Sequence, residues 1–316
     1  MTPARSTLLA QARAASPLLK AVLLVVTVTF FFSCMDSAAK ALSERYEPFF
    51  VVWARYVVQA VLVTLLLAPR LGRLARTKQL GLQILRSSLL FAATMMFFYG
   101  FSVMKLADVI AVAQVSPLAI TAMAALLLGE RVGPWRWLGV GLGFIGALVI
   151  LRPGLGEAGW TTLYPLGGAL FFAAYGVSTR ALGPDENPWT TFFYTGLVGA
   201  IVASLAAPFL LSAGLGAEIA APGADEASWR VDALLFLAAG VFGALGQGVL
   251  ILAFSLAPAS LLAPYFYSGL LWSILFGYVL FGEWPDAFTF AGAAIILGAG
   301  LFVQWRERRA AAPAAP

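Results

Sequence analysis

Two charged residues one helical turn apart lie inside an apolar stretch near the N-terminus. Asp36 and Lys40 fall within residues 21–43, which otherwise hold apolar and small side chains. Residues four apart share a helix face, so these two can form an ion pair. An ionisable group inside an apolar span costs roughly 2.5–3.5 kcal/mol to insert and is therefore a candidate for function. The pair could bind a carboxylate or amine, or relay a proton; alternatively, Lys40 reaches the membrane interface and only shields Asp36.

A second set of candidates could line a cavity around this pair. Arg55, in Trp53-Ala54-Arg55-Tyr56, could hold an anionic group, although a structural role as the partner of Asp36 or Glu47 is favoured. Rings with a few polar groups suit an apolar or aromatic solute, whereas the alternative for each ring is core packing or lipid contact. The uncharged candidates for substrate binding are Met95, Tyr99, Gln114, Tyr175, Gln247, Tyr265, Tyr267 and Trp272.

The residues that most enzymes need are scarce. The chain has no histidine and one cysteine, Cys34, and Asp36 is its only deeply placed acid. A membrane-embedded enzyme would need a nucleophile with a base, paired carboxylates or a metal cluster, so we expect no enzyme, no metal site and no cofactor. No Walker motif is present, so the chain is not expected to hydrolyse ATP.

The amino-acid composition of this chain is typical of a protein embedded in a lipid bilayer. Apolar residues make up 61% of the 316 positions and charged residues 11%, against about 45–50% and 25% in soluble domains. A span needs about 17–25 residues, and backbone groups in lipid must bond within their own segment. The sequence therefore predicts an all-α membrane protein with ten spans, at about 21–43, 49–68, 84–104, 108–128, 134–151, 161–182, 189–212, 232–255, 259–281 and 286–305.

Lysine and arginine predict the orientation. Of 20 such residues, Lys40 and Arg55 fall within spans, and a cytoplasmic N-terminus leaves only Arg45, Lys105, Arg152 and Arg230 outside. The other fourteen are then inside, which the positive-inside rule favours. We therefore expect an inner-membrane protein with both termini in the cytoplasm. The basic clusters alternate with spans, so the net charge of +5 indicates no nucleic-acid partner.

The two halves of the chain resemble each other. Leu128-Gly129-Glu130 returns as Phe281-Gly282-Glu283, and these glutamates are expected at the interface beside a turn. Each half has five spans, so the second copy must be inverted, a design of transporters that bind substrate where the copies meet. Asp36 aligns with Gly176, which favours a task for Asp36 in the first half alone. Three further matches, 140 positions apart, are Phe31-Phe32 with Phe171-Phe172, Lys40-Ala41-Leu42 with Arg180-Ala181-Leu182, and Pro48 with Pro188.

A known family shares this pattern. The run Leu-Leu-Leu-Gly-Glu-Arg at 126–131, followed by the glycine-rich segment 138–141, resembles an EamA domain, and two such domains in tandem resemble the drug/metabolite transporter superfamily. The resemblance covers about residues 21–305 and implies a ten-helix carrier of small solutes, often amino acids or related metabolites. We expect repeats at 21–152 and 161–305, with cytoplasmic tails at 1–20 and 306–316. Gly139, Gly141, Gly143 and Gly146 are expected to be packing residues.

The sequence thus predicts a secondary transporter of a small metabolite, such as an amino acid or an aromatic or amphipathic solute. Its partners would be that solute and the lipid bilayer, and it would act as a monomer or homodimer. Spans 108–128 and 259–281 are expected to face one another across a central cavity. A flippase for a lipid-linked or amphipathic compound is the alternative that the same architecture could support.

Overall fold

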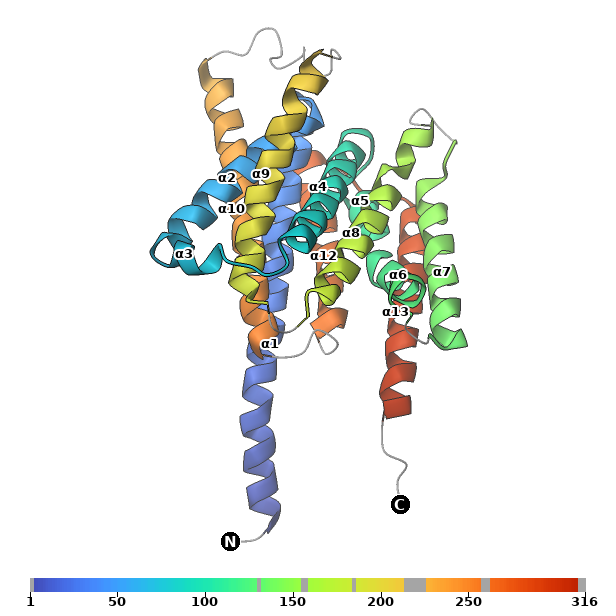
Figure 1. The fold of residues 1–316 in the computed structure, drawn as a ribbon. Helices are drawn as coiled ribbons and strands as arrows, with labels where there is room; N and C mark the ends of the chain where they lie inside the picture. The colour runs from blue at the N-terminus through green and yellow to red at the C-terminus, as the bar shows by residue number, and fades with distance from the viewer. Residues whose placement is uncertain are drawn as a thin grey trace.

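The described part of the chain is entirely helical. The computed structural model describes residues 3–129, 132–154, 159–183, 186–212, 226–256 and 262–311, and no strand occurs among them. The expected all-α architecture is therefore confirmed (Figure 1). The elements are α1 (Pro3–Ser43), α2 (Pro48–Leu67), the 3-10 helix η1 (Ala68–Arg70), α3 (Leu71–Leu74), α4 (Leu80–Val103), α5 (Leu106–Ala113), α6 (Ser116–Leu128), α7 (Pro134–Leu151), η2 (Gly159–Leu163), α8 (Tyr164–Ala181), α9 (Pro188–Ser212), α10 (Glu226–Leu256), η3 (Ala263–Tyr267), α12 (Ser268–Phe281) and α13 (Ala287–Ala311).

Eight segments in the described residues are long and apolar enough to cross a membrane. They comprise α1 from Leu19, α2 with its continuation to Leu74, α4, α5 with α6, α7, α9, α10 and α13. Two expected spans fall outside this set, namely the 18-residue α8 and Tyr265–Phe281, which is a shorter apolar helix. Figure 1 places both ends of the chain at the same end of the bundle, here called the terminal end, and the opposite one is the distal end.

The segment expected at 108–128 is broken in the middle. Gln114 and Val115 separate α5 from α6, and their amides bond three residues back, to Ala111 and Val112. Pro117 follows at the start of α6, where a missing amide hydrogen costs no helical bond. The segment expected at 259–281 is described from residue 262 and is likewise divided, into η3 and α12.

The recurring glycine-glutamate motif ends both broken segments. Gly129 caps α6 at φ 68° and Gly282 caps α12 at φ 66°. This left-handed conformation costs glycine nothing and other residues about 1 kcal/mol or more, which explains the residue type at both positions. Glu283 follows at the distal end, whereas Glu130 lies outside the described residues.

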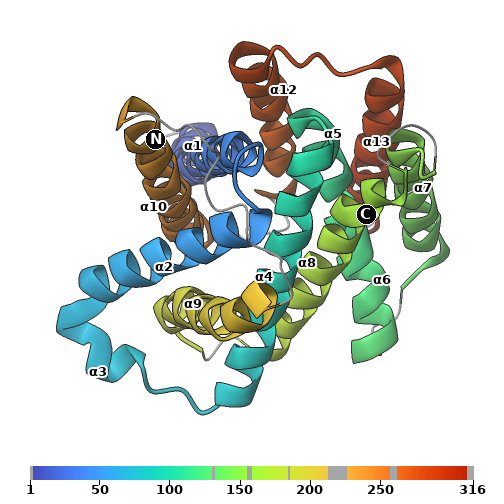
Figure 2. The ribbon, with the colours of Figure 1, turned by 90° about the horizontal axis from the view of Figure 1, so that it is seen from above.

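The helices pack in pairs that combine the two halves. The main contacts join α1 to α10, α4 to α8, α2 to α9 and α7 to α13 (Figure 2). In the last pair, a Cβ built on Gly146 would lie 2.8 Å from the Gly292 carbonyl, and one on Gly292 would lie 2.5 Å from the Gly146 carbonyl. The packing role expected of Gly141 is wrong, because that residue is exposed and a Cβ there would meet no atom within 4 Å.

Candidate substrate cavity

A cavity of about 310 Å³ lies toward the terminal end, where α4 and α9 begin and α8 and α10 end. It combines one helix of the first half with three of the second. Its wall carries three rings, three threonines, an arginine, a glutamate and a glutamine. The lining residues are Arg86, Tyr175, Thr179, Leu182, Gly183, Glu186, Pro188, Thr191, Phe192, Thr195, Gln247, Leu250, Ile251 and Phe254.

Arg86 dominates the polar wall of this cavity. Its side chain is only 2% exposed. Its Nε donates to Thr179 Oγ1 at 3.1 Å, and its Nη2 donates to the Tyr175 hydroxyl at 2.8 Å. Its Nη1 donates to the Thr191 carbonyl at 3.2 Å and to Thr195 Oγ1 at 3.0 Å. One residue of α4 is thereby tied to both α8 and α9.

Gln247, on the cavity wall, is bonded to a second glutamine behind it. Gln247 of α10 accepts a bond from Gln59 Nε2 of α2 at 3.4 Å, and Gln59 is fully buried. The Gln59 carbonyl oxygen has no partner among the described residues. One turn along α10, Gly243 packs against the Arg55 guanidinium, whose charge acts on Asp36.

Asp36 and Lys40 do not pair as expected. Lys40 Nζ instead lies 3.0 Å from Glu283 Oε1 and donates to the Met104 carbonyl at 2.9 Å. The opposite charge that acts on Asp36 is Arg55, as the structural interpretation of that arginine favoured. The two side chains have different neighbours, because Lys40 reaches the carbonyls of Phe101 and Met104 at the end of α4, whereas Asp36 lies within the influence of Arg55 on α2.

At the distal end, ion pairs join the two halves and close the bundle. Arg45 Nη1 lies 2.7 Å from Asp232 Oδ1, and the Tyr46 hydroxyl donates to Asp232 Oδ2 at 2.9 Å. Burial, followed by this bond to Asp232, raises the pKa of Tyr46, so its hydroxyl stays protonated as the donor. Glu283 adds to the closure by accepting from the Leu106 amide at 3.0 Å.

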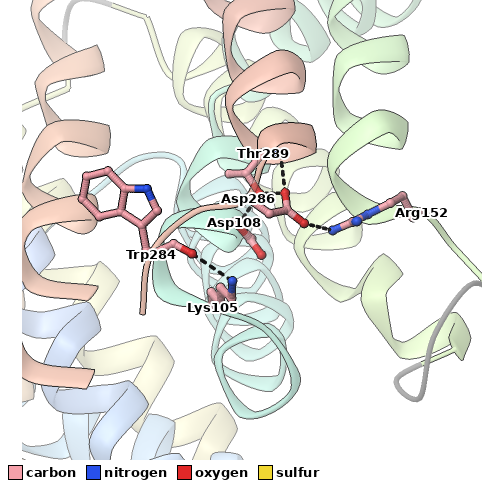
Figure 3. A network of polar contacts seen from close by, with 6 residues as sticks. All are labelled: Lys105, Asp108, Arg152, Trp284, Asp286 and Thr289. Atoms are coloured by element: carbon pink, nitrogen blue, oxygen red, sulfur yellow. Dashed lines mark hydrogen bonds and ion pairs between the residues drawn. The ribbon is translucent and has the colours of Figure 1, made fainter. Parts of the chain in front are cut away.

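A second network lies further along the distal end (Figure 3). It borders a cavity of about 500 Å³ between α4, α5, α7 and α13. Among the described residues, Arg152 and Asp286 form the ion pair of this network, whereas Lys105 donates to a backbone carbonyl and Asp108 accepts from a hydroxyl. The bonds run from Arg152 Nη2 to Asp286 Oδ2 at 2.6 Å, from Lys105 Nζ to the Trp284 carbonyl at 2.9 Å, and from Thr289 Oγ1 to Asp108 Oδ1 at 2.7 Å.

Comparison with known proteins assigns the family. The model of the EamA-like transporter family matches residues 19–152 and again 159–304. The chain belongs to the EamA-like transporter family. Together with its apolar helices, this membership makes it a multi-pass membrane protein of the transporter class.

Relatives of this EamA-like transporter carry different names. A riboflavin transporter of Brucella anthropi is 31% identical over 81% of this chain and 88% of its own length. A riboflavin transporter of Vibrio cholerae is 29% identical over 92% and 95%, and an S-adenosylmethionine uptake transporter of Rickettsia felis is 28% identical over 88% and 90%. A solved crystal structure shares the fold at a TM-score of 0.57 and 17% identity, covering 95% of this chain and 99% of that one.

The structure brings two of the proposed substrate residues, Tyr175 and Gln247, into the cavity. The others lie elsewhere. Tyr99 donates to Glu47 at the distal end, and Met95 packs against the buried core beside α1 and α2. Gln114 caps α5, and Trp272 packs against Phe30, with its indole nitrogen unpartnered among the described residues. On η3, Tyr265 is exposed and Tyr267 packs against Gly300 of α13.

Two residues of the site and its closure were underrated by sequence reasoning. Arg86 is one of the fourteen basic residues that the positive-inside rule places in the cytoplasm, although it lies two residues inside the span expected at 84–104. Glu283 was assigned to the interface, yet it pairs with Lys40 and accepts from a helix start. The available signal for Arg86 was its depth in an apolar span, which by itself marks a functional candidate.

Proposed function

We propose that this EamA-like transporter is a secondary carrier that moves a small solute with a planar aromatic body, of the riboflavin kind, across the inner membrane. The supporting observation is a cavity that lies between helices of both halves and is lined by three aromatic rings. At the distal end, ion pairs between the halves hold the bundle together. Tyr175, Phe192 and Phe254 supply surfaces for a flat ring, and Gln247 can donate to and accept from a heteroaromatic edge. The names of two relatives point to the same class.

The architecture proposed for this carrier has ten spans in two inverted repeats, at 21–152 and 161–305. Pairing of the helices supports it, because the first helix of each half packs on the third of the other, as α1 does on α10 and α8 on α4. The second helices α2 and α9 pack together, as do the last helices α7 and α13. This is the pattern that a pseudo-two-fold axis in the membrane plane produces. The breaks before α6 and α12 lie at equivalent places in the repeat.

The proposed cycle alternates between two closures. With residues 1–20 and 306–316 in the cytoplasm, the cavity lies on the cytoplasmic side and the bonded distal end is periplasmic. Rocking of the halves would break the pairs from Lys40 and Arg45 and close the Arg86 cavity. The energy comes from the gradient of the solute or of an ion, and the carrier works as a monomer or homodimer.

Purified protein in proteoliposomes tests this function. We expect saturable riboflavin flux above that of empty liposomes, without ATP, and its loss in Tyr175→Ala. Gly141→Ala, at an open and exposed position, is the matched control and should transport normally. If riboflavin is not transported and a non-aromatic amino acid is, the proposed aromatic substrate class is wrong and amino acids take its place.

A further inference from the structure

The Arg86 guanidinium is buried without an acid. All four of its bonds go to neutral oxygens, namely the hydroxyls of Thr179, Thr195 and Tyr175 and one backbone carbonyl. No ion pair to Arg86 occurs within the described residues. Glu186 is the acid among the residues that line the cavity, and it forms no ion pair with Arg86. An arginine at such a depth is costly unless an opposite charge or water offsets it.

The surroundings of Arg86 are also incompletely bonded. Its neighbours on α4, Gln83 and Ser87, are fully buried. The Gln83 carbonyl oxygen and the Ser87 hydroxyl have no partner among the described residues. Buried polar groups are nearly always bonded in a finished core. Unmet polar groups beside an uncompensated charge are therefore typical of a site that is filled in another state of the protein.

We propose that the cargo carries an anionic oxygen group, a carboxylate or a phosphate, that binds Arg86 while its aromatic body lies along Tyr175 and Phe192. This rests on the proposed function and narrows its substrate class. A guanidinium binds such groups through two parallel bonds, and the present hydroxyl partners can rotate away at low cost. The Tyr175 ring already lies 4.7 Å from the guanidinium carbon, so a flat solute held there would meet both.

A purely structural role for Arg86 makes a different prediction. In that case Arg86 only ties α4 to α8 and α9, and its loss lowers stability without changing the preference between charged and neutral ligands. Binding of matched ligand pairs separates the two. The pairs are flavin mononucleotide with riboflavin, which differ by a phosphate, and indole-3-acetate with indole-3-acetamide, which differ by a carboxylate charge.

The experiment measures equilibrium binding of these four compounds to the full chain in detergent at pH 7. We expect the anion of at least one pair to bind about 10-fold tighter than its neutral partner, or about 1.4 kcal/mol. Arg86→Gln should reduce this preference to below about 2-fold. Arg180→Gln removes an exposed charge one residue from Thr179, outside the cavity wall, and should leave the preference unchanged.

Arg86→Lys keeps the experiment decisive if Arg86→Gln aggregates. Lysine retains the charge without the two-bond geometry, so the preference should fall without vanishing. Equal affinity within both pairs, failure of both anions to bind, or an unchanged preference in the Arg86 variants would overturn the proposal. Riboflavin flux without any anion preference would overturn the role of Arg86 and leave the proposed function standing. Anion preference without riboflavin flux would support the role of Arg86 and overturn riboflavin as the cargo.

Discussion

Lys40 Nζ lies 3.0 Å from Glu283 Oε1, so a lysine of the first half is paired with a glutamate of the second. The same nitrogen donates to the Met104 carbonyl, and Glu283 Oε2 accepts from the Leu106 amide. The ends of α1, α4 and α12 and the start of α5 thus meet at one ion pair. A carrier that opens at its distal end has to separate these groups.

Breaking this pair should destabilise the distal closure. Lys40→Gln leaves the carboxylate of Glu283, 23% exposed, without its cation, and we expect a loss on the order of 2 kcal/mol, seen as a lower melting temperature. The swapped double variant, Lys40→Glu with Glu283→Lys, should recover part of it. Arg152→Gln is the control, because Arg152 and its partner Asp286 are 36% and 37% exposed and their pair should contribute less than about 1 kcal/mol. Equal losses in both single variants would contradict the assigned importance of Lys40.

The close approach of α7 and α13 gives a second prediction. Gly146→Ala places a methyl group against a backbone carbonyl of α13, which cannot rotate away, so we expect a loss of about 1–3 kcal/mol. Gly292→Ala should behave alike. Gly141→Ala, five residues from Gly146 on the same helix, has open space and should be neutral or slightly stabilising. Thermal unfolding in detergent measures all three, and a comparable loss at Gly141 would refute this account of the interface.

Acid should weaken the distal network at Asp286. Burial raises the pKa of this carboxyl, but bonds from Thr289 and Arg152 outweigh that effect and hold it below its usual value. A lowered folded pKa gives stability that is present above the unfolded value, about 3.9, and is lost as the pH falls through the folded value. The melting temperature of wild type should therefore exceed that of Asp286→Asn down to about pH 5, with the gap closing below about pH 4. A gap that widens in acid would reverse the sign of this argument.

The proposed orientation can be tested by labelling. We expect Ser228→Cys, in the first turn of α10 and within the segment 211–232, to react with a membrane-impermeant maleimide in intact spheroplasts. The excess of lysine and arginine in the alternate loops places those loops in the cytoplasm and this segment in the periplasm. Cys34→Ala serves as the background, because Cys34 is the chain's own thiol. Reaction only after the cells are broken open would place both termini outside.

Apolar length and turn residues predict most of the fold. Nearly every helix begins or ends within a few residues of its expected position, because Pro48, Pro134 and Pro188 start helices and Gly129 and Gly282 end them. Gln114, Ser116 and Pro117 interrupt the apolar run without ending the span, so apolar length alone does not predict the break between α5 and α6. A single sequence also does not predict which residues pack against another helix. Gly141 and Gly146 lie in the same glycine-rich segment, yet only Gly146 contacts another helix.

The site was less predictable than the fold. Depth in a span correctly singled out Asp36, Lys40 and Arg55 as buried charges, and all three are less than 9% exposed. Their partners depend on how the helices are arranged. The spacing of four residues suggested an ion pair between Asp36 and Lys40, but Lys40 pairs with Glu283 on another helix. Arg86 and Glu283 acquire their partners from segments about 90 or more positions away, so nothing local indicated those partners.

The last prediction concerns the role of Asp36, whose opposite charge is Arg55 and not Lys40. Because Lys40 is held by Glu283, neutralising Asp36 removes the counter-charge of Arg55 instead. If Asp36 serves transport, as a proton acceptor or as partner of a cationic group, Asp36→Asn should reach the membrane at normal levels yet lose flux or its pH dependence. The neutral double variant, Asp36→Asn with Arg55→Gln, should then stay inactive although no buried charge is left unpaired. If the two residues are only a structural pair, the double variant should recover both abundance and flux. Proteoliposome flux from pH 5.5 to 8, normalised to the amount of inserted protein, decides between them, and normal flux by Asp36→Asn across that range would eliminate a transport role for this carboxylate.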